Sequence, residues 1–467
     1  MASLDRRQLL AGVGAAGMAA ALGGPIARAA DTSGYKALVC VFLFGGMDHA
    51  DTILPMDAAS FDLLAAARDG MFNAYGVGSG TSSRDRLNLL PLSPLNAGAL
   101  GGREYGLPSQ LAPLLSLFDA GELAVVGSVG PLIEPTTRTT FEDGTARVPA
   151  QLFSHNDQQS AWQTFGAEGS TFGWGGRFVD AALQSDPAAD PRFAAISTNG
   201  NAAFLSGATS TAFNVSPNGA VGVDVVNRRG QLGGGADFDA TRAAMFDYFA
   251  RANFGVDNIF QRDFAALQSA GIVSGAEFTT AFENASVTTP FPATGIGGQL
   301  RAIAETISVR NALGVSRQVF FAGLGGFDTH SNQTNQLPNL HTQFADAVAA
   351  FRDAMIELGA WNDVTIFSAA DFGRTLNDNG DGTDHGWAGH HFVAGGSVAG
   401  RRVFGALPTS DQGTEEYTAN RGRLIPTVSV DQYAATLGAW FGLEDAELDA
   451  ALPNLGNFAA RDIGFMR

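Results

Sequence analysis

The sequence has little cysteine and few basic side chains, and its N-terminal apolar run is short. Cys40 is the only cysteine in 467 residues, so the chain has no disulfide framework. Lysine and arginine number 28 against 46 aspartates and glutamates. Such a surface repels nucleic acid and anionic lipid, so neither is an expected partner. The charge does not exclude a small anionic substrate, because a bound metal ion dominates the charge of its own pocket.

The N-terminus carries the pattern of an export signal. Paired arginines (Arg6–Arg7) precede a weakly apolar stretch over Leu9–Leu22, which is too short to span a bilayer, and Ala27–Ala29 offers a peptidase site. The pair is similar to a twin-arginine signal, which would direct the folded protein to the twin-arginine export machinery; an ordinary secretory leader is the alternative. We expect removal of residues 1–29, no integral membrane segment afterwards, and a periplasmic, extracellular or cell-surface location.

Apolar runs that end in glycine or an acidic residue alternate with helical patterns along the chain. These runs are typical of strands buried on both faces of a parallel sheet. The alternation predicts an α/β fold, a doubly wound sandwich with a mostly parallel central sheet. Strands are predicted over 36–48, 122–130, 192–197, 317–328, 363–373 and 390–398, and helices over 110–122, 239–254 and 340–359.

Residues 30–467 are expected to form one elaborated domain without internal repeats. The segment of about 185–298 is rich in Gly, Ala, Ser, Thr and Asn, and we interpret it as an insertion or cap over the sheet. Two short helices are predicted over 429–455.

Acidic residues follow several of the predicted strands. Asp48, Asp328 and Asp371 each stand at such a strand end, and in a doubly wound sheet ligands bind beyond the carboxyl ends of the strands. The string DFGRTLNDNGDGTDHGWAGHH, which begins at Asp371, adds three of the seven histidines within seven residues. Carboxylate and imidazole at this density, in a glycine-rich loop, favour a metal site over a packed core.

Two acid–histidine pairs are the first candidate ligands. Asp328 and His330 in GGFDTH lie two apart, so in an extended loop both can reach one ion. Asp384 and His385 are adjacent, and together they suit Zn²⁺, Mn²⁺ or Fe. Asp48 is either a further ligand or a turn or helix-capping residue.

The remaining histidines are less clearly placed. His390 and His391 open a predicted strand, so their side chains should point to opposite faces and only one can face the site. We favour His390, because it is nearer to the loop. His341, in the predicted helix over 340–359, is interpreted as a surface histidine.

Ser154 begins a predicted helix, where the helix dipole favours an anion or an alkoxide. It is a candidate nucleophile or a plain N-cap, with Asp157 at the capping-box position. Its neighbour His155 is a candidate ligand or general acid. Arg374 can grip an anionic oxygen of a substrate, or pair with Asp371.

These motifs resemble a known family, the exported bacterial proteins named for the domain of unknown function DUF1501. The resemblance covers nearly the whole mature chain and is carried by VFLFGGMDHADT, SHNDQQSAWQTFG, GGFDTHSNQ, DFGRTLNDNGDGTDHGWAGHHFVAGGSVAG and SVDQYAATLGAWFG. The family is in turn similar to the alkaline phosphatase and sulfatase superfamily, whose enzymes hold two metals near a serine, threonine or formylglycine nucleophile.

The resemblance implies an alkaline phosphatase-like three-layer sandwich with one or two divalent ions. Zn²⁺ is the first expectation, with Mn²⁺, Fe or Ca²⁺ as alternatives. The superfamily's order of ligands and nucleophile is matched along this chain by Asp48, Ser154, Asp328 with His330, Asp384 with His385, and His390 or His391.

Three functions are compatible with these observations. The leading hypothesis is an exported metal-dependent hydrolase of small phosphate or sulfate esters, in which metals lower the pKa of serine or water and Arg374 steadies the developing charge. The second is a non-catalytic exported surface or assembly protein that retains a metal for stability. The third is a carbohydrate- or envelope-binding module, indicated by the Gly- and Asn-rich middle. The sequence does not indicate the oligomeric state.

Overall fold

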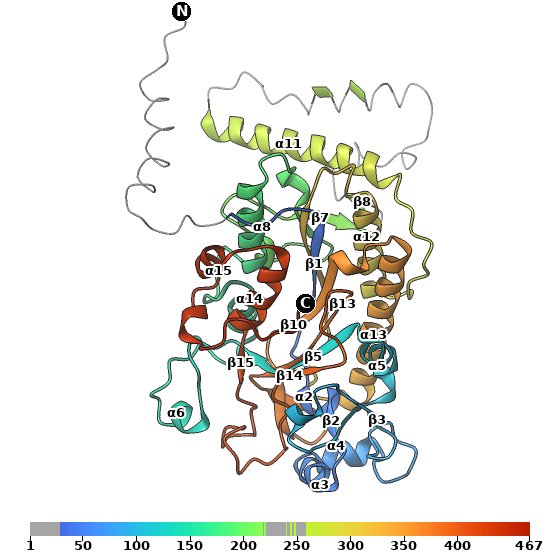
Figure 1. Cartoon of the computed structure of the whole chain (residues 1–467), viewed down its shortest axis with the longest axis vertical. Coiled ribbons are helices and arrows are strands. Elements are labelled where there is room, and N and C mark those ends of the chain that lie inside the picture. Colours follow the sequence, from blue (N-terminus) through green and yellow to red (C-terminus); the bar gives the residue numbers. More distant parts are fainter. Residues whose placement is uncertain (1–28, 218, 221–239, 241–242, 245–246, 249–257) are drawn as a thin grey trace, which may run out of the picture.

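The computed structural model shows a central sheet between helices (Figure 1). It describes residues 29–217, 219–220, 240, 243–244, 247–248 and 258–467. All but the last residue of the predicted signal, and most of the predicted helix over 239–254, lie outside the described residues. Within the described part, no helix is both long and apolar enough to cross a membrane.

Among the described residues, the central sheet has ten strands, in the order β14-β5-β13-β10-β1-β9-β6-β7-β8, with β15 also paired to β5. Most neighbouring strands are parallel, but β13 runs antiparallel to both β10 and β5, and β8 runs antiparallel to β7. The strands are β1 (Lys36–Leu43), β5 (Leu123–Gly130), β6 (Ala195–Ser197), β7 (Phe213–Ser216), β8 (Gly219–Ala220), β9 (Arg317–Leu324), β10 (Val364–Ala370), β13 (Gly389–Gly395), β14 (Val403–Gly405) and β15 (Val428–Ser429).

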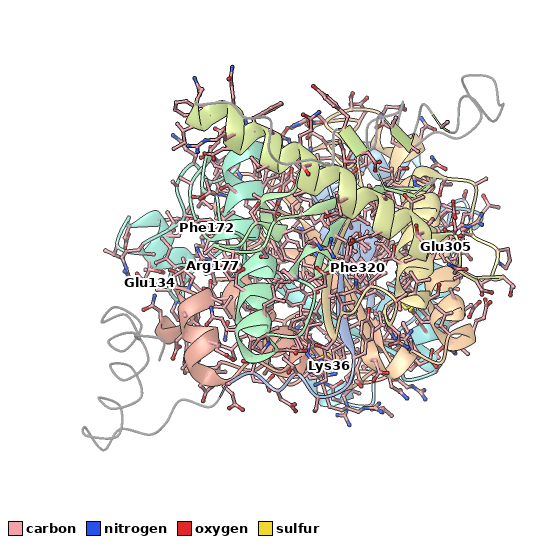
Figure 2. All side chains as sticks on the ribbon, turned by 90° about the horizontal axis from the view of Figure 1, so that it is seen from above. Lys36, Glu134, Phe172, Arg177, Glu305 and Phe320 are labelled. Carbon is pink, nitrogen blue, oxygen red and sulfur yellow. The ribbon has the colours of Figure 1, made fainter. Side chains whose placement is uncertain are left out.

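Helices cover both faces of this sheet and complete a three-layer sandwich. Along β1, Val39 and Val41 pack into one hydrophobic core and Leu38 and Phe42 into the other, because successive side chains of a strand alternate. The first core is closed by α5 (Ala112–Asp119), α12 (Gly295–Ser308) and α13 (Gln333–Glu357). The second is closed by α7 (His155–Thr164), α8 (Trp174–Ser185), α14 (Val430–Phe441) and α15 (Asp445–Ala451). Seen from above, Phe320 of β9 lies in the interior (Figure 2).

Smaller elements surround the sandwich. β11 (Arg374–Asp378) and β12 (Thr383–His385) form a hairpin, and β2 (Leu54–Pro55), β4 (Tyr105–Leu107) and β3 (Leu90–Pro91) form a three-stranded sheet. The remaining α-helices with bounds in the described part of the chain are α2 (His49–Thr52), α3 (Ala58–Ala67), α4 (Asp69–Ala74), α6 (Arg138–Glu142) and α11 (Ile259–Phe282).

The central strands end in register, and this positions the site. Leu43 of β1 pairs with Ala370 of β10 on one side and with Leu324 of β9 on the other. The loops that follow all three strands therefore emerge at the same edge of the sheet. The α/β fold predicted from the sequence is confirmed, and the two predicted C-terminal helices correspond to α14 and α15. The segment of about 185–298 supplies β6, β7, β8 and α11.

Candidate metal centre

Four side chains converge beyond the carboxyl ends of the central strands. Asp328 and His330 lie in the loop after β9, and His155 begins α7. His385 ends β12, and its register pairing with Arg374 of β11 folds it back towards the end of β10. We call Asp328, His155, His330 and His385 the histidine–carboxylate cluster.

The three imidazoles of this cluster meet at a single carboxylate oxygen. Oδ1 of Asp328 lies 3.3 Å from Nε2 of His155, 3.2 Å from Nε2 of His330 and 3.3 Å from Nε2 of His385. The ligand atoms of His155, Asp328 and His385 all lie within 4.8 Å of one another. Nε2 of His330 and Nε2 of His385 are only 2.8 Å apart.

The other ring nitrogen of each histidine faces an acceptor. Nδ1 of His155 lies 2.6 Å from Oδ2 of Asp371, and Nδ1 of His330 lies 3.2 Å from Oδ1 of Asp384. Nδ1 of His385 lies 2.6 Å from the carbonyl oxygen of Phe153. A carboxylate or a carbonyl accepts the proton of Nδ1, so each neutral imidazole presents the lone pair of Nε2 to the centre of the cluster.

This arrangement has the chemistry of a metal site. Histidines that bind metals usually donate their second ring N–H to a carboxylate or a backbone carbonyl, as these three do. Tetrahedral metal–ligand bonds of about 2.0 Å place neighbouring ligand atoms about 3.3 Å apart, which matches the separations around Oδ1 of Asp328. Three nitrogens and one oxygen suit Zn²⁺, Mn²⁺ or Fe better than Ca²⁺, which prefers oxygen ligands.

The pKa values of the histidines differ for physical reasons. The hydrogen bond to Asp371 raises the pKa of His155. Burial, and then the positive charge of Arg374, lower the pKa values of His330 and His385 relative to an ordinary histidine. The carboxylate of Asp371 therefore favours a proton on His155 more than the surroundings of His330 and His385 do on those rings.

Arg374 is a support for the cluster. Its guanidinium is fully buried and donates from Nη1 to Oδ1 of Asp328 at 2.8 Å and to the carbonyl of Gly45 at 2.9 Å. Further donations go to the carbonyl and hydroxyl oxygens of Thr383. The predicted grip on a substrate oxygen is not what this geometry presents, since Arg374 contacts the cluster only through Asp328. It does not pair with Asp371 either.

Gly45 connects the three strand ends through its backbone. Its φ is +114°, and a Cβ atom there would lie 2.1 Å from the backbone nitrogen of Asp328. Its N–H donates to Oδ2 of Asp371 at 3.2 Å, while its carbonyl accepts from Arg374. Only glycine permits this close approach together with a positive φ.

Asp48 does not join the cluster, although the sequence offered it as a ligand. Arg68 donates to both of its oxygens at 2.7 Å, and Gln333 donates to Oδ2 at 2.5 Å. Asp48 also accepts from the backbone N–H of Ala50 as the N-cap of α2, which was the alternative prediction. Burial would raise the pKa of Asp48, but the ion pair with Arg68 outweighs it and lowers the pKa to about 2.

The late histidines also lie apart from the cluster. Nδ1 of His390 accepts from the backbone N–H of Ser128 at 3.1 Å, and Nδ1 of His391 lies 3.1 Å from the hydroxyl oxygen of Ser368. The two side chains occupy opposite faces of β13, as predicted, but neither contacts Asp328. Burial lowers the pKa of both. His341 is buried against Thr52, so the prediction of a surface histidine is wrong.

Asp384 lies behind His330, where it orients the ring. Besides Nδ1 of His330, its Oδ1 is within 3.3 Å of the side-chain amide of Asn379, and Arg421 pairs with its other oxygen. Asp384 was predicted as a metal ligand. In the structure it instead contacts Nδ1 of His330 and so orients a candidate ligand. Arg421 is a contact that the sequence did not indicate.

Ser154 is the N-cap residue of α7, yet its side chain makes no capping hydrogen bond. The preceding residue, Phe153, has φ +75°, an uncommon value for a bulky residue. This conformation accompanies the hydrogen bond from His385 to the carbonyl of Phe153. Arg423 stacks over the Phe153 ring at 4.0 Å and donates to the carbonyl of His385 at 3.0 Å.

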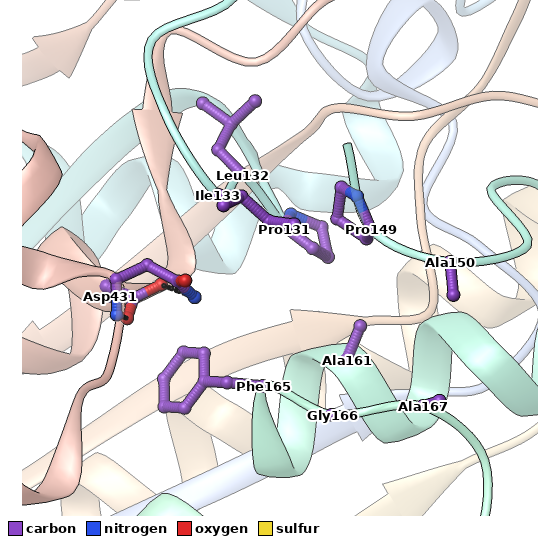
Figure 3. Close-up of a pocket in the computed structure, with 11 residues that line it drawn as sticks. Pro131, Leu132, Ile133, Pro149, Ala150, Ala161, Phe165, Gly166, Ala167 and Asp431 are labelled. Carbon is purple, nitrogen blue, oxygen red and sulfur yellow. Dashed lines mark hydrogen bonds between the residues drawn. The ribbon is translucent and has the colours of Figure 1, made fainter. Parts of the chain in front are cut away.

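A separate cavity of about 90 Å³ lies against the same helix, α7 (Figure 3). Its lining includes Ala161 of α7, the C-cap residue Phe165, Pro131, and Asp431 at the start of α14. Asp431 accepts hydrogen bonds from the backbone and side chain of Asn454. Burial raises the pKa of Asp431 to about 7.

Fold and site together define an α/β protein with a candidate metal centre at the carboxyl edge of its sheet. The sequence profile of DUF1501, described as a protein of unknown function, matches residues 138–450. The chain belongs to the DUF1501 family. No curated protein matches it.

Solved structures similar to this chain include a sulfatase. The PsFucS1 sulfatase from Pseudoalteromonas sp. superimposes with a TM-score of 0.37 and 9% identity, covering 100% of this chain and 78% of the other. Ps i-CgsB in complex with k-i-k-neocarrahexaose gives a TM-score of 0.33 and 10% identity, covering 89% and 74%. Likeness at these scores supports no argument about activity.

Proposed function

We propose that this protein is an exported metal-dependent hydrolase of phosphate or sulfate esters. The observation that carries the proposal is the convergence of three imidazole Nε2 atoms on Oδ1 of Asp328, each ring being oriented through its Nδ1. Two neutral rings whose lone pairs face each other at 2.8 Å repel unless a cation lies between them. A bound cation accounts for the arrangement more simply than a hydrogen-bond network does.

His155, Asp328 and His385 would hold the ion, with His330 as a further ligand or a neighbour. When bound, a divalent ion supplies Lewis-acid polarisation of an ester oxygen and lowers the pKa of a coordinated hydroxyl or water. Asp371 and the carbonyl of Phe153 fix the two imidazoles from behind, so both enter the site as neutral ligands. Phe372 packs against both rings, with centroid distances of 4.8 Å and 4.6 Å.

Ser154 is the candidate nucleophile on this proposal. It precedes His155 directly, stands at the N-terminus of α7, and its hydroxyl is not used for capping. The helix dipole favours an alkoxide at this position. Arg421 and Arg423, which border Asp384 and His385, are better candidates than Arg374 for contacting ester oxygens. The side chain of Arg421 is 55% exposed, whereas Arg374 is enclosed by protein acceptors.

Metal analysis combined with an ester screen tests the proposal. Protein purified without chelator should contain a transition metal and hydrolyse 4-nitrophenyl phosphate or 4-nitrophenyl sulfate. Asp328→Asn should lose both properties, whereas Asp381→Asn, an exposed carboxylate of the β11–β12 hairpin outside the cluster, should keep them. Metal-free wild-type protein, or an Asp328→Asn variant with full activity, would refute the proposal.

His330 favours a second candidate function, a metal retained for stability. If His330 is a fourth ligand, the ion has a closed tetrahedral shell, as in structural zinc sites, whereas catalytic sites keep one position open. The His330→Ala variant separates the two functions. A catalytic three-ligand site should retain its metal and its activity, while a closed structural site should lose the metal and melt at a lower temperature.

A further inference from the structure

A cleft lined by side-chain amides lies directly beside the histidine–carboxylate cluster. Its volume is about 300 Å³, and its polar lining includes Asn156, Gln159, Asn199, Asn201 and Ser170. We call it the amide cleft. It is distinct from the cavity beside Asp431, since the two share no lining residue.

Two segments join the amide cleft to the cluster. Gln159 lines the cleft and donates to Oδ2 of Asp371 at 3.0 Å, on the oxygen that also orients His155. Gln159 stands four residues after His155 on α7, so both side chains lie on the same side of the helix. Phe44 also lines the cleft and immediately precedes Gly45, whose N–H reaches Asp371. A molecule in the cleft would therefore adjoin any group bound at the cluster.

The wall opposite α7 is built so that an amide and an aromatic ring approach the sheet closely. A Cβ atom at position 323 of β9 would lie 2.3 Å from Nδ2 of Asn199 and 2.7 Å from the ring of Phe44. Gly323 thus makes room for both. Asn199 is exposed, and its side-chain amide hydrogen-bonds to no other described residue, so it can donate to and accept from a ligand.

The side chains that line the amide cleft favour a neutral, hydroxyl-rich ligand. A side-chain amide both donates and accepts, as a sugar hydroxyl does, and a ring such as Phe44 offers an apolar face to sugar C–H groups. No lysine, arginine or histidine is among the described residues of the cleft, and its charged member is Glu168. An anionic group is therefore disfavoured in the cleft and favoured at the cluster beside it.

We infer that the amide cleft binds a neutral saccharide unit, the alcohol portion of a sulfated or phosphorylated sugar whose ester group lies at the cluster. The role as part of an ester substrate rests on the proposed function, but binding of the saccharide does not require the metal. The Asn- and Gly-rich string that includes Asn199 and Asn201 thereby acquires a function as one wall of a sugar site.

Ligand-observed NMR with neutral saccharides tests the inference. The probes are methyl glycosides of galactose, glucose, fucose and N-acetylglucosamine and their uncharged oligosaccharides, titrated to millimolar concentration with the purified protein. At least one should bind. Loss of one neutral hydrogen-bonding group in Asn199→Ala should weaken it about 3- to 10-fold, and Asn201→Trp, which fills the cleft, should abolish binding. Asn73→Leu, an exposed asparagine of α4 outside the cleft, is the matched control and should bind as wild type does.

The outcomes separate this inference from the proposed function. Saccharide binding that persists in Asp328→Asn but is lost in Asn201→Trp supports the cleft even if no ester is hydrolysed. Ester hydrolysis without binding of any saccharide in the panel would overturn the inference and leave the hydrolase proposal intact. Saccharide binding that is unchanged in both Asn199→Ala and Asn201→Trp would also overturn it, because the sugar would then bind elsewhere.

Discussion

Two polar groups beneath the same edge of the sheet contrast sharply. In one, Asp48 is buried and Arg68 donates to both of its oxygens, while Gln333 and the N–H of Ala50 donate as well. In the other, Asp328 is 45% exposed, Arg374 donates to its Oδ1, and three imidazole Nε2 atoms lie within 3.3 Å of the same oxygen. Both carboxylate oxygens of Asp48 therefore receive N–H donors. Around Asp328, with the three rings neutral, the acceptor atoms outnumber the hydrogens that could be donated to them.

This difference shows how a structural ion pair can be told from a site for a cation. Both groups hold a carboxylate beyond a strand end, and residue type alone does not separate them. What separates them is the number of donor hydrogens available to the acceptor atoms. The two groups are also linked, because Oε1 of Gln333 accepts from the hydroxyls of Thr329 and Thr383, and Thr383 in turn accepts from Arg374.

The largest effect is expected from breaking the buried ion pair. Asp48→Asn leaves the guanidinium of Arg68 buried without a counter-charge, which should lower the free energy of unfolding by about 3–5 kcal/mol. Chemical denaturation measures this loss, and metal content should stay at the wild-type level. The double variant with Arg68→Met should recover part of the stability. An Asp48→Asn protein that lost its metal and kept its stability would make Asp48 a ligand and reverse the contrast.

The next effect concerns the cluster itself. Asp328→Asn keeps an oxygen for the hydrogen bond from Arg374 but removes the negative charge. Metal affinity, measured by competition with a chromophoric chelator, should fall by about 100-fold or more, since loss of a ligand's hydrogen-bond partner alone typically costs 10–100-fold. The melting temperature of the metal-free protein should fall less than in Asp48→Asn, because Asp328 is 45% exposed and Arg374 keeps the carbonyl of Gly45 and the hydroxyl of Thr383 as acceptors. A large drop in that melting temperature with unchanged metal affinity would show that Asp328 belongs to a structural ion pair and not to a metal site.

A smaller effect should follow from the partner of His155. In Asp371→Asn, the amide oxygen can still accept from Nδ1 of His155, but the charge behind the ring is lost. We expect metal affinity to fall about 10- to 100-fold. His341→Gln, a buried histidine outside the cluster, provides the comparison and should leave the affinity unchanged.

The smallest effect tests a third environment, a buried carboxylate without any cation. Burial raises the pKa of Asp431 from 3.8 to about 7, so the folded state keeps a proton that the unfolded state has already released. Stability from this group is therefore present at low pH and is lost as the pH rises through 7. Between pH 6 and pH 8 the loss should be about 1.4 kcal/mol. The change in unfolding free energy between pH 6 and pH 8 should differ by that amount between wild type and Asp431→Asn. Identical pH dependence of the two proteins would contradict the raised pKa of Asp431.

Much of the candidate site at the carboxyl edge of the sheet was predictable from the sequence, because strand ends and ligand types are local properties. Asp328, His330 and His385 were identified, since each stands beside a glycine-rich turn after or between apolar runs. The partner of Asp48 was not, because Arg68 stands between α3 and α4, twenty positions away, and no sequence pattern marks it. His341 carried a readable signal, four residues after Leu337 and three before Phe344 on the buried face of α13.

Two further features depend on tertiary structure. β13 runs against its neighbours, and this orientation sets which buried partners His390 and His391 meet. His155 had been left open as a ligand or a general acid, and only the folded chain brings it to Asp328 and Asp371. Arg421 and Arg423 reach the site from a loop without periodicity, so no sequence pattern announced them.

The glycine at position 45 has a consequence for how the site receives a ligand. Because its backbone is hydrogen-bonded to both Asp371 and Arg374 and touches the backbone of Asp328, the three strand ends are fixed relative to one another before anything binds. Capturing an ion would therefore order few new torsions, so little conformational entropy is lost on association. A methyl group at this one position would turn a preorganised receptor into one that must be assembled by its ligand.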